Sequence, residues 1–183
     1  LDEGVMPEVV PGRFPGKTAI RLDEHSLKAK RFELDDQVFT AQMWIKINGV
    51  GTHRGNGGAT NGTLMAIGVG YWDGLRITTS LPSIVPNLEL GRPRGINSFG
   101  VSARAALMQG HWQHVAVSWD GKKLRCYING KLTGQADYDT AYTDPGDAKF
   151  VIGFNGHGVG STNFDVDQVV VHKRCLSAGE IAI

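Results

Sequence analysis

The sequence has almost no cysteine and no long apolar segment, and each shortage excludes a class of protein. Cys126 and Cys175 are its two cysteines. Neither belongs to a Cys-x-x-Cys pair, so a structural zinc knuckle and a thioredoxin-type dithiol are excluded. Two outcomes stay open: one disulfide bond in an exported protein or, the interpretation we favour, two free thiols that act as small hydrophobes. No apolar run approaches the roughly 20 residues that span a bilayer, so we expect no membrane insertion.

Charge of one sign is also lacking. Nineteen Lys and Arg residues stand against eighteen Asp and Glu residues, for a net charge of +1. A protein that binds a phosphate backbone needs a positive face, which this balance does not provide. We therefore expect no nucleic-acid partner.

Helical periodicity is scarce, whereas glycine is abundant, with 25 of 183 residues. The usual share of glycine is about 7%. Apolar residues recur at every second position from Phe39 to Ile47, which predicts a strand with one buried face. Asn129-Gly130 predicts a type I′ hairpin turn. Ser177 and Glu180 form a capping-box pattern, which predicts a helical turn near the end of the sequence.

Some ten to fourteen short strands joined by turns predict an all-β fold: an antiparallel two-sheet jelly-roll sandwich, with at most a short C-terminal helical turn. A chain of 183 residues suits one domain over residues 1–183. Because position 1 is Leu and the sequence stops soon after the predicted helical turn, we expect a domain of a larger multidomain protein.

Two local expectations concern the ends of the chain. Residues 1–13 contain Pro7 and Pro11 and are expected to form an irregular lead-in. Strict alternation along residues 164–172 predicts that one face of this strand carries Phe164, Val166, Gln168, Val170 and His172, with Asp165, Asp167, Val169 and Val171 on the other.

Several motifs occur in a fixed order along the chain. They are Phe14-Pro15-Gly16, then Phe39-Thr40-Ala41-x-x-Trp44, then "GHWQHVAVSWDGKKLRCYINGKLTG" (110–134), "FVIGF" (150–154) and "FDVDQVVVHKRCLSAGEI" (164–181). In this order they resemble the laminin-G-like domains of the concanavalin A-like lectin/glucanase superfamily, the pentraxin and laminin-G type of jelly roll. The resemblance implies the fold. It leaves the function open, because members bind glycans, bind proteins or hydrolyse polysaccharides.

Catalytic residues are not evident. The hydrolases of this superfamily carry Glu-x-Asp-x-x-Glu on one strand. The segment Glu33–Val38 lacks the final carboxylate, and Asp165–Gln168 lacks both glutamates. Neither supplies the acid and the nucleophile that glycoside hydrolysis requires, so we expect no enzyme.

The spacing of candidate ligand residues along the sequence does not predict a metal site either. His111 and His114 are three residues apart in a predicted strand, and so point to opposite faces. We expect His114 to donate a hydrogen bond that fixes a strand end. Because related sandwiches often hold Ca²⁺ in rim loops, no cofactor is certain but Ca²⁺ is an open candidate. No motif selects among its candidate ligands, Asp23, Glu24, Asp73, Asn97, Asp144, Asp147 and Asn155.

Polar, glycine-rich connections are the candidate ligand-binding segments. We expect a non-catalytic recognition module for carbohydrate, in which polar groups bind hydroxyls and aromatic rings cover the C–H faces of sugars. The alternative is a protein-interaction, adhesion or spacer domain without glycan binding. Either would be secreted, periplasmic or at the cell surface, beside neighbouring domains of the same polypeptide. The candidate ligand-binding residues are His53, Arg54, Asn56 and Asn61, then Tyr71 and Trp72, then Asn155 and His157.

Overall fold

The computed structural model describes residues 7–29, 38–52, 61–70, 73–80, 83–90, 99–138, 150–154 and 160–181. Over these ranges the chain forms thirteen strands and one short helix. They are β1 (Glu8–Pro11), β2 (Thr18–Leu22), β3 (Ser26–Ala29), β4 (Phe39–Val50), β5 (Gly62–Gly70), β6 (Asp73–Ser80), β7 (Val85–Leu90), β8 (Phe99–Ser102), β9 (Trp112–Trp119), β10 (Lys123–Ile128), β11 (Lys131–Asp137), β12 (Phe150–Gly153), β13 (Thr162–His172) and α1 (Ala178–Ile181). No described helix is long and apolar enough to cross a bilayer.

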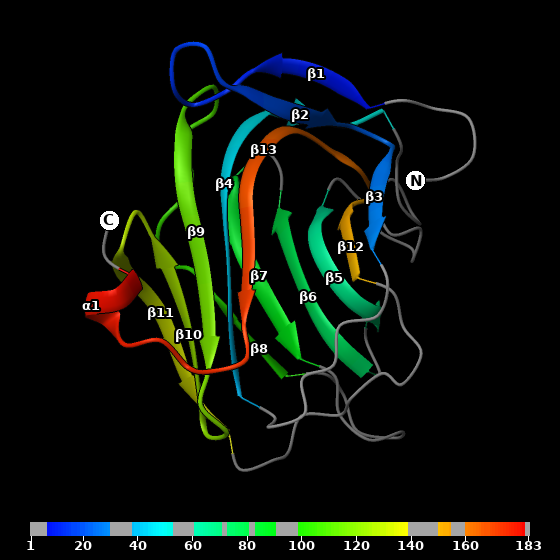
Figure 1. Ribbon diagram of the computed structural model, residues 1–183. Helices are drawn as coiled ribbons and strands as arrows, with labels where there is room; N and C mark the ends of the chain where they lie inside the picture. The colour runs from blue at the N-terminus through cyan, green and yellow to red at the C-terminus, as the bar shows by residue number, and fades with distance from the viewer. Residues whose placement is uncertain are drawn as a thin grey trace.

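The strands form two antiparallel sheets (Figure 1). Sheet A has the order β1-β2-β13-β4-β9-β10-β11, and sheet B has the order β3-β12-β5-β6-β7-β8. Strands that are distant in sequence are neighbours in both sheets, for example β13 between β2 and β4, as in a jelly roll. The predicted all-β sandwich with one short helical turn is confirmed.

The core lies between the two sheets because apolar side chains alternate along the strands. The predicted buried face of β4 is confirmed: Phe39, Ala41, Met43, Ile45 and Ile47 are each at most 1% exposed. They belong to one apolar cluster with side chains of sheet B such as Met65 and Leu75. The alternate residues of β4 therefore point outward from sheet A.

The expected irregular lead-in is wrong for part of its length. Glu8–Pro11 forms β1, which pairs antiparallel with β2, from Glu8↔Arg21 to Pro11↔Thr18. A strand at the edge of a sheet tolerates proline because one row of its backbone groups needs no partner strand. Val9 on this strand is 63% exposed, so alternation gave only a weak strand signal there.

The faces predicted for β13 are correct before Gln168 and wrong after it. Asp167 pairs with Trp44 and Val170 pairs with Gln42, so two residues of β13 lie opposite one residue of β4. This is a β-bulge, and Gln168 has a positive φ of 49°. The bulge reverses the alternation, so Val169 and Val171 pack on the core. Val170, 41% exposed, does not.

The turn at Asn129-Gly130 and the helix cap are confirmed. Asn129 and Gly130 have φ of 50° and 74° and join β10 to β11 directly. At α1 the Ser177 backbone N–H donates to Glu180 Oε2 at 2.8 Å, and the Glu180 N–H donates to Ser177 Oγ at 3.3 Å. The helix places Ile181 in a small outer cluster with Ala116, Tyr127 and Leu176.

The two cysteines are free thiols on opposite sides of sheet A. Cys126 lies in the core, and burial raises the pKa of its thiol to about 11. Cys175 Sγ lies 4.0 Å from the Arg125 guanidinium. Arg125 and Cys126 are consecutive in β10 and so point to opposite faces. The sheet therefore separates the two sulfur atoms, and the free-thiol interpretation is confirmed.

Candidate functional site

One row of paired residues crosses five strands on the outer face of sheet A. Strand pairing aligns Glu8 of β1, Arg21 of β2, Asp165 of β13, Lys46 of β4 and Trp112 of β9. Negative and positive side chains alternate along the row until Trp112, where the Lys46 ammonium lies 5.5 Å from the ring centroid. Cross-strand neighbours of opposite charge stabilise a sheet.

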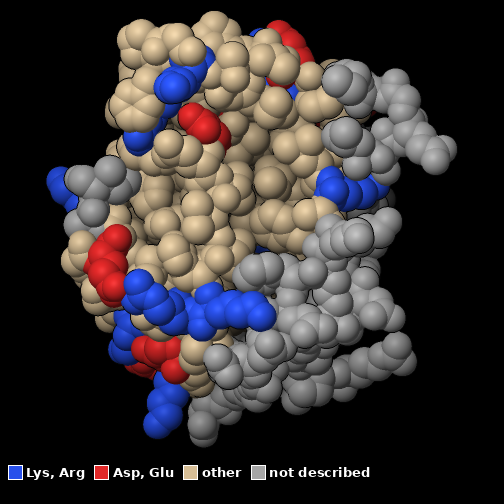
Figure 2. Space-filling view, viewed as in Figure 1, with Lys and Arg blue, Asp and Glu red and all other residues tan. Residues whose placement is uncertain are grey.

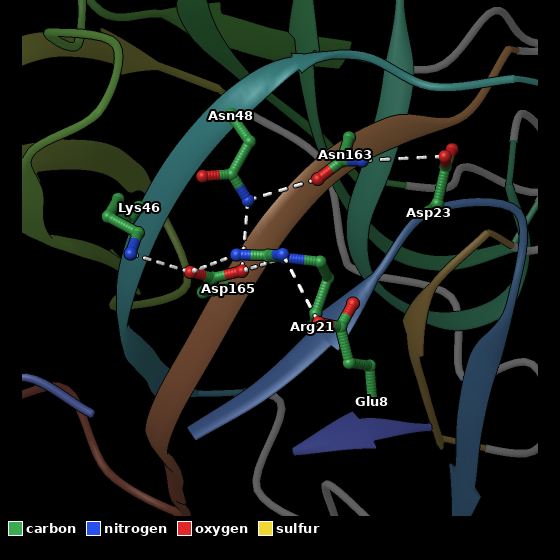
Figure 3. A network of polar contacts seen from close by, with 7 residues as sticks. All are labelled: Glu8, Arg21, Asp23, Lys46, Asn48, Asn163 and Asp165. Carbon is green, nitrogen blue, oxygen red and sulfur yellow. Dashed lines mark hydrogen bonds and ion pairs between the residues drawn. The ribbon is translucent and has the colours of Figure 1, made fainter. Parts of the chain in front are cut away.

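Asp165 is the centre of this row (Figure 3). Its side chain is fully buried, and Arg21 Nε donates to its Oδ1 at 2.7 Å. Lys46 Nζ lies 2.7 Å from Oδ2, and Asn48 Nδ2 donates to Oδ1 at 2.9 Å. Three donors from the two flanking strands, β2 and β4, thus point at one buried carboxylate on β13.

These contacts decide the chemistry that Asp165 can perform. Burial alone would raise its pKa, but the hydrogen bonds from Arg21, Lys46 and Asn48 outweigh burial and hold the pKa below its ordinary value. Asp165 and Asp167 are two residues apart on one face, about 7 Å along a strand, within the range of roughly 5–9 Å found in glycosidases. A buried, ionised carboxylate with its oxygens engaged is unsuited to act as the acid of such a pair.

The polar network continues from Asp165 towards the ends of the strands (Figure 3). Asn48 Nδ2 also donates to Asn163 Oδ1 at 3.0 Å, and Asn163 Nδ2 lies 3.5 Å from Asp23 Oδ2. Asp23 follows β2, Asn48 is near the end of β4, and Asn163 is near the start of β13. The network therefore ends where the chain leaves sheet A for its loops.

Backbone hydrogen bonds join the bases of two candidate ligand-binding segments at this edge. Gly51 N–H donates to the Ser161 carbonyl at 2.9 Å, and Gly160 N–H donates to the Asn61 carbonyl at 2.8 Å. Gly62 also forms an isolated bridge with Gly160. The residues that flank 53–60 are thus in contact with those that follow 155–159.

Seven of the eight candidate ligand residues lie outside the described residues: His53, Arg54, Asn56, Tyr71, Trp72, Asn155 and His157. The eighth, Asn61, is half-buried directly before β5. Gly70 and Asp73, which flank Tyr71 and Trp72, pair with each other at the other end of β5. A strand of nine residues spans about 26 Å. The sequence-predicted segments therefore divide between two ends of sheet B.

A cluster of stacked side chains lies beside the row, where Arg13 stacks on two aromatic rings. Its guanidinium carbon is 3.6 Å from the ring centroid of Trp44 and 4.2 Å from that of Phe14. Cation–π contacts of this kind are stabilising. Trp44 also packs against His114, at 5.4 Å between ring centroids. The turn before β2 is thus attached to sheet A.

The hydrogen bond expected from the side chain of His114 is not found at its Nδ1. This atom is buried without a partner among the described residues. The strand end is fixed instead by the His114 backbone N–H, which donates to Asn129 Oδ1 at 2.9 Å. Burial, with the nearby charge of Arg13, lowers the pKa of His114 to about 4. His114 is therefore a neutral packing residue at pH 7.

No three His, Cys, Asp or Glu side chains gather into a group that could hold a metal ion within the described ranges. Of the oxygen ligands considered for Ca²⁺, the Asp23 carboxylate accepts hydrogen bonds from Thr52 and Ser161. Asn97, Asp144, Asp147 and Asn155 lie outside the described residues.

Two glycines at the loop bases permit a close approach of β13. A Cβ on Gly62 would lie 2.6 Å from the Thr162 backbone nitrogen, and one on Gly51 would lie 2.6 Å from the Ser161 carbonyl carbon. Such contacts force backbone atoms apart. Both positions therefore require glycine, which has no Cβ.

Gly62→Ala is expected to lower the free energy of unfolding by about 1–3 kcal/mol, since a methyl group must be accommodated against backbone. Thermal or urea unfolding measures the change. Gly179→Ala is the matched control, because a Cβ there meets nothing within 4 Å. Equal stability of Gly62→Ala and the parent chain would contradict this close approach.

The charge distribution of one face is visible in Figure 2. Lys and Arg side chains lie beside Asp and Glu side chains along the lower left of this face, and its centre is uncharged. Ion pairs among the described residues include Arg125–Asp120 and Arg174–Glu180, both at 2.7 Å. This view offers no broad surface of a single charge.

The sequence offered Asp23 only as one of seven candidate Ca²⁺ ligands and did not connect it with the other residues that organise this edge. Asp23, Asn48, Ser161 and Asn163 are distributed over three separate parts of the chain, and 138 residues separate Asp23 from Ser161. No local spacing links them. The available signal was weak: short polar residues directly after or before predicted strands.

The two facing sheets and their crossovers define a jelly-roll domain, and comparison identifies its family. The chain belongs to the concanavalin A-like lectin/glucanases superfamily, because a family model of that description, of laminin-G type, matches residues 17–182. The predicted family is confirmed. No curated protein matches the chain.

Solved structures share the fold at low sequence identity. The binding domain of Paraclostridial Mosquitocidal Protein 1 aligns with a TM-score of 0.72 and 15% identity, over 96% of this chain and 44% of that one. Domain 4 of AbnA, an extracellular arabinanase from Geobacillus stearothermophilus solved with arabinotriose, aligns with a TM-score of 0.69 and 17% identity, over 98% and 81%. The CBM40 of a Ruminococcus gnavus sialidase, solved with sialyllactose, aligns with a TM-score of 0.63 and 16% identity. The alignment covers 79% of this chain and 80% of that one. This chain thus spans less than half of the first of these chains.

Proposed function

We propose that this chain is a non-catalytic carbohydrate-recognition module, accessory to a larger protein that is secreted, periplasmic or at the cell surface. The observation that carries the proposal is the contact between the two loop bases, Gly51 with Ser161 and Asn61 with Gly160. Polar segments that leave the sandwich from one edge can present several hydrogen-bond donors and acceptors to one ligand, which is what a sugar with many hydroxyls requires.

The first site of this module consists of His53, Arg54, Asn56 and Asn61 with Asn155 and His157. Tyr71 and Trp72, at the other end of β5, form a separate aromatic subsite that stacks on sugar rings. Two sites on one module favour polymeric or branched glycans, because a chain held at one end has a raised effective concentration at the other.

Two observations support a role in binding rather than hydrolysis. Asp165, a carboxylate of one of the two incomplete hydrolase motifs, is buried and paired with Arg21 and Lys46. The similar structures reported above are described as a binding domain, an arabinanase domain solved with arabinotriose and a carbohydrate-binding module solved with sialyllactose.

The test is binding of the purified chain to a glycan array and to polysaccharides in affinity gels. We expect retardation by at least one polysaccharide. Arg54→Ala or His157→Ala should weaken binding about tenfold, the loss of one or two hydrogen bonds. Trp72→Ala should reduce affinity for long chains more than for short oligosaccharides. Arg104→Ala, an exposed arginine on the connection from β8 to β9, is the matched control and should bind as the parent chain does.

Absence of binding across a broad panel would overturn the proposal and favour a protein-interaction or spacer role. Glycan hydrolysis by the purified chain would overturn its non-catalytic part.

A further inference from the structure

The turn between β2 and β3 lies against the bases of both segments that form the first proposed site. Asp23 in this turn contacts residue 52, which precedes 53–60, and residue 161, which follows 155–159. The backbone carbonyl of His25, in the same turn, accepts a hydrogen bond from the Phe154 N–H at 3.3 Å, and Phe154 directly precedes 155–159. One short turn thus contacts both flanks of 155–159 and one flank of 53–60.

The Asp23 carboxylate makes the contacts that join these bases. Its Oδ1 accepts from the Thr52 backbone N–H at 2.8 Å, from the Thr52 hydroxyl at 3.4 Å and from the Ser161 hydroxyl at 3.2 Å. Its Oδ2 lies 3.5 Å from Asn163 Nδ2. Hydrogen bonds to a charged acceptor are stronger than those between neutral groups.

The surroundings of Asp23 leave little room for another arrangement. A Cβ on Gly51 would lie 2.5 Å from Asp23 Oδ1, so the chain before Thr52 approaches the carboxylate as closely as a glycine permits. Asn163 connects Asp23 to Asn48 and hence to Asp165 in the core of the network. The carboxylate is therefore held in place by the folded sheet and in turn holds the loop bases.

We infer that Asp23 is a positioning residue for the first proposed site: it holds Thr52 and Ser161, which flank segments 53–60 and 155–159, in one relation, and this lets the two segments bind the same ligand. This inference rests on the proposed function. It makes the two segments one composite site whose affinity depends on a residue that does not itself touch the sugar, because a preorganised site loses less entropy on binding.

The test compares Asp23→Ala with Glu24→Ala. Glu24 is an exposed residue of the same turn, and both substitutions replace a carboxylate side chain by a methyl group and remove one negative charge. Hydrogen exchange measured by mass spectrometry on the unliganded proteins follows the backbone amides. In Asp23→Ala we expect exchange to become about tenfold faster at the loop bases together, residues 51–52 and 160–161. The amides of β9 and β10 should exchange as in the parent chain, as should all segments in Glu24→Ala.

Binding to the glycan retained by the parent chain supplies the second readout. We expect Asp23→Ala to weaken it about tenfold at an unchanged melting temperature. Asp23→Asn should recover part of the affinity, because an amide oxygen still accepts from Thr52 and Ser161.

The outcomes separate this inference from the proposed function. Unchanged exchange at either loop base overturns the joining role of Asp23, whatever the parent chain binds. Faster exchange at both bases with unchanged affinity overturns its role in binding. A parent chain that binds no glycan overturns the proposed function and the ligand assigned to the composite site, and this is seen before any variant is made.

Discussion

Asp165→Ala is expected to lower the free energy of unfolding by about 3 kcal/mol, because it leaves Arg21 and Lys46 side by side without their shared counter-ion. Removing one partner of a buried ion pair costs about 3–5 kcal/mol. We take the lower end because the Arg21 and Lys46 side chains are 33% and 23% exposed, so that water can solvate them in part. Urea unfolding at pH 7 measures the difference.

Asp167→Ala is the matched control. Asp167 lies two residues further along the same face of β13 and is half-exposed, and its loss should change stability by about 0.5 kcal/mol or less. If Asp165→Ala is no less stable than Asp167→Ala, the charged row does not stabilise sheet A. If Asp165→Ala does not fold, Asp165→Asn, which keeps the hydrogen-bond acceptor for Arg21, should fold with an intermediate loss.

Acid is expected to destabilise the protein by about 3 kcal/mol between pH 6.5 and pH 4 through His114. The folded pKa of His114 is about 4, against an ordinary value of 6.5. Between these values the unfolded chain binds a proton that the folded chain does not. Stability from this group is therefore fully present above pH 6.5 and falls as the pH is lowered towards 4. Urea unfolding at a series of pH values measures the slope.

His114→Phe should flatten the slope in this window, because it removes the titrating group and keeps an aromatic ring against Trp44. His111→Phe, at the exposed neighbouring histidine, should leave the slope unchanged. A slope that persists in His114→Phe would contradict the assignment. Where this variant folds poorly, an NMR titration of the parent chain decides the matter: the His114 ring should stay neutral well below pH 6.

Below about pH 4 a different group, Asp165, controls the loss of stability. The depressed pKa of Asp165 means that its stabilising contribution is present above its ordinary pKa and is lost as the pH falls further. As the pH is lowered, stability should therefore be lost first through protonation of His114 and then through protonation of Asp165.

Local patterns predicted the local structure well. The alternation from Phe39 to Ile47 predicted the buried face of β4, Asn129-Gly130 predicted the turn after β10, and Ser177 with Glu180 predicted the cap of α1. Each of these depends on residues within a few positions of one another, where backbone geometry and side-chain period decide the outcome.

The failures have equally specific causes. β1 was missed because an edge strand with an exposed Val9 and a terminal Pro11 lacks a clear alternation. The faces of β13 were wrong after residue 167 because the bulge places Gln168, and not the usual glycine, at a positive φ, so that the sequence carried no signal for it.

For the candidate site, the sequence indicated polar loops but not their partners. Asp165 stood out by its spacing from Asp167, yet its contacts with Arg21, 144 residues away, and Asn48, 117 residues away, depend on strand order. Asp23 was one of several acidic residues with no means of choosing among them.

The sequence by itself determined the all-β sandwich and the strands whose side chains alternate, because these follow from short-range periodicity and turn chemistry; the laminin-G type came from the resemblance of its ordered motifs to that family. Only the tertiary structure decided that Asp165 is a buried counter-ion, that the bases of two polar segments meet at Asp23, and that the segment with Tyr71 and Trp72 leaves from the other end of β5. The reason is that pairing between distant strands brings these groups together, and no local pattern encodes which strands will pair.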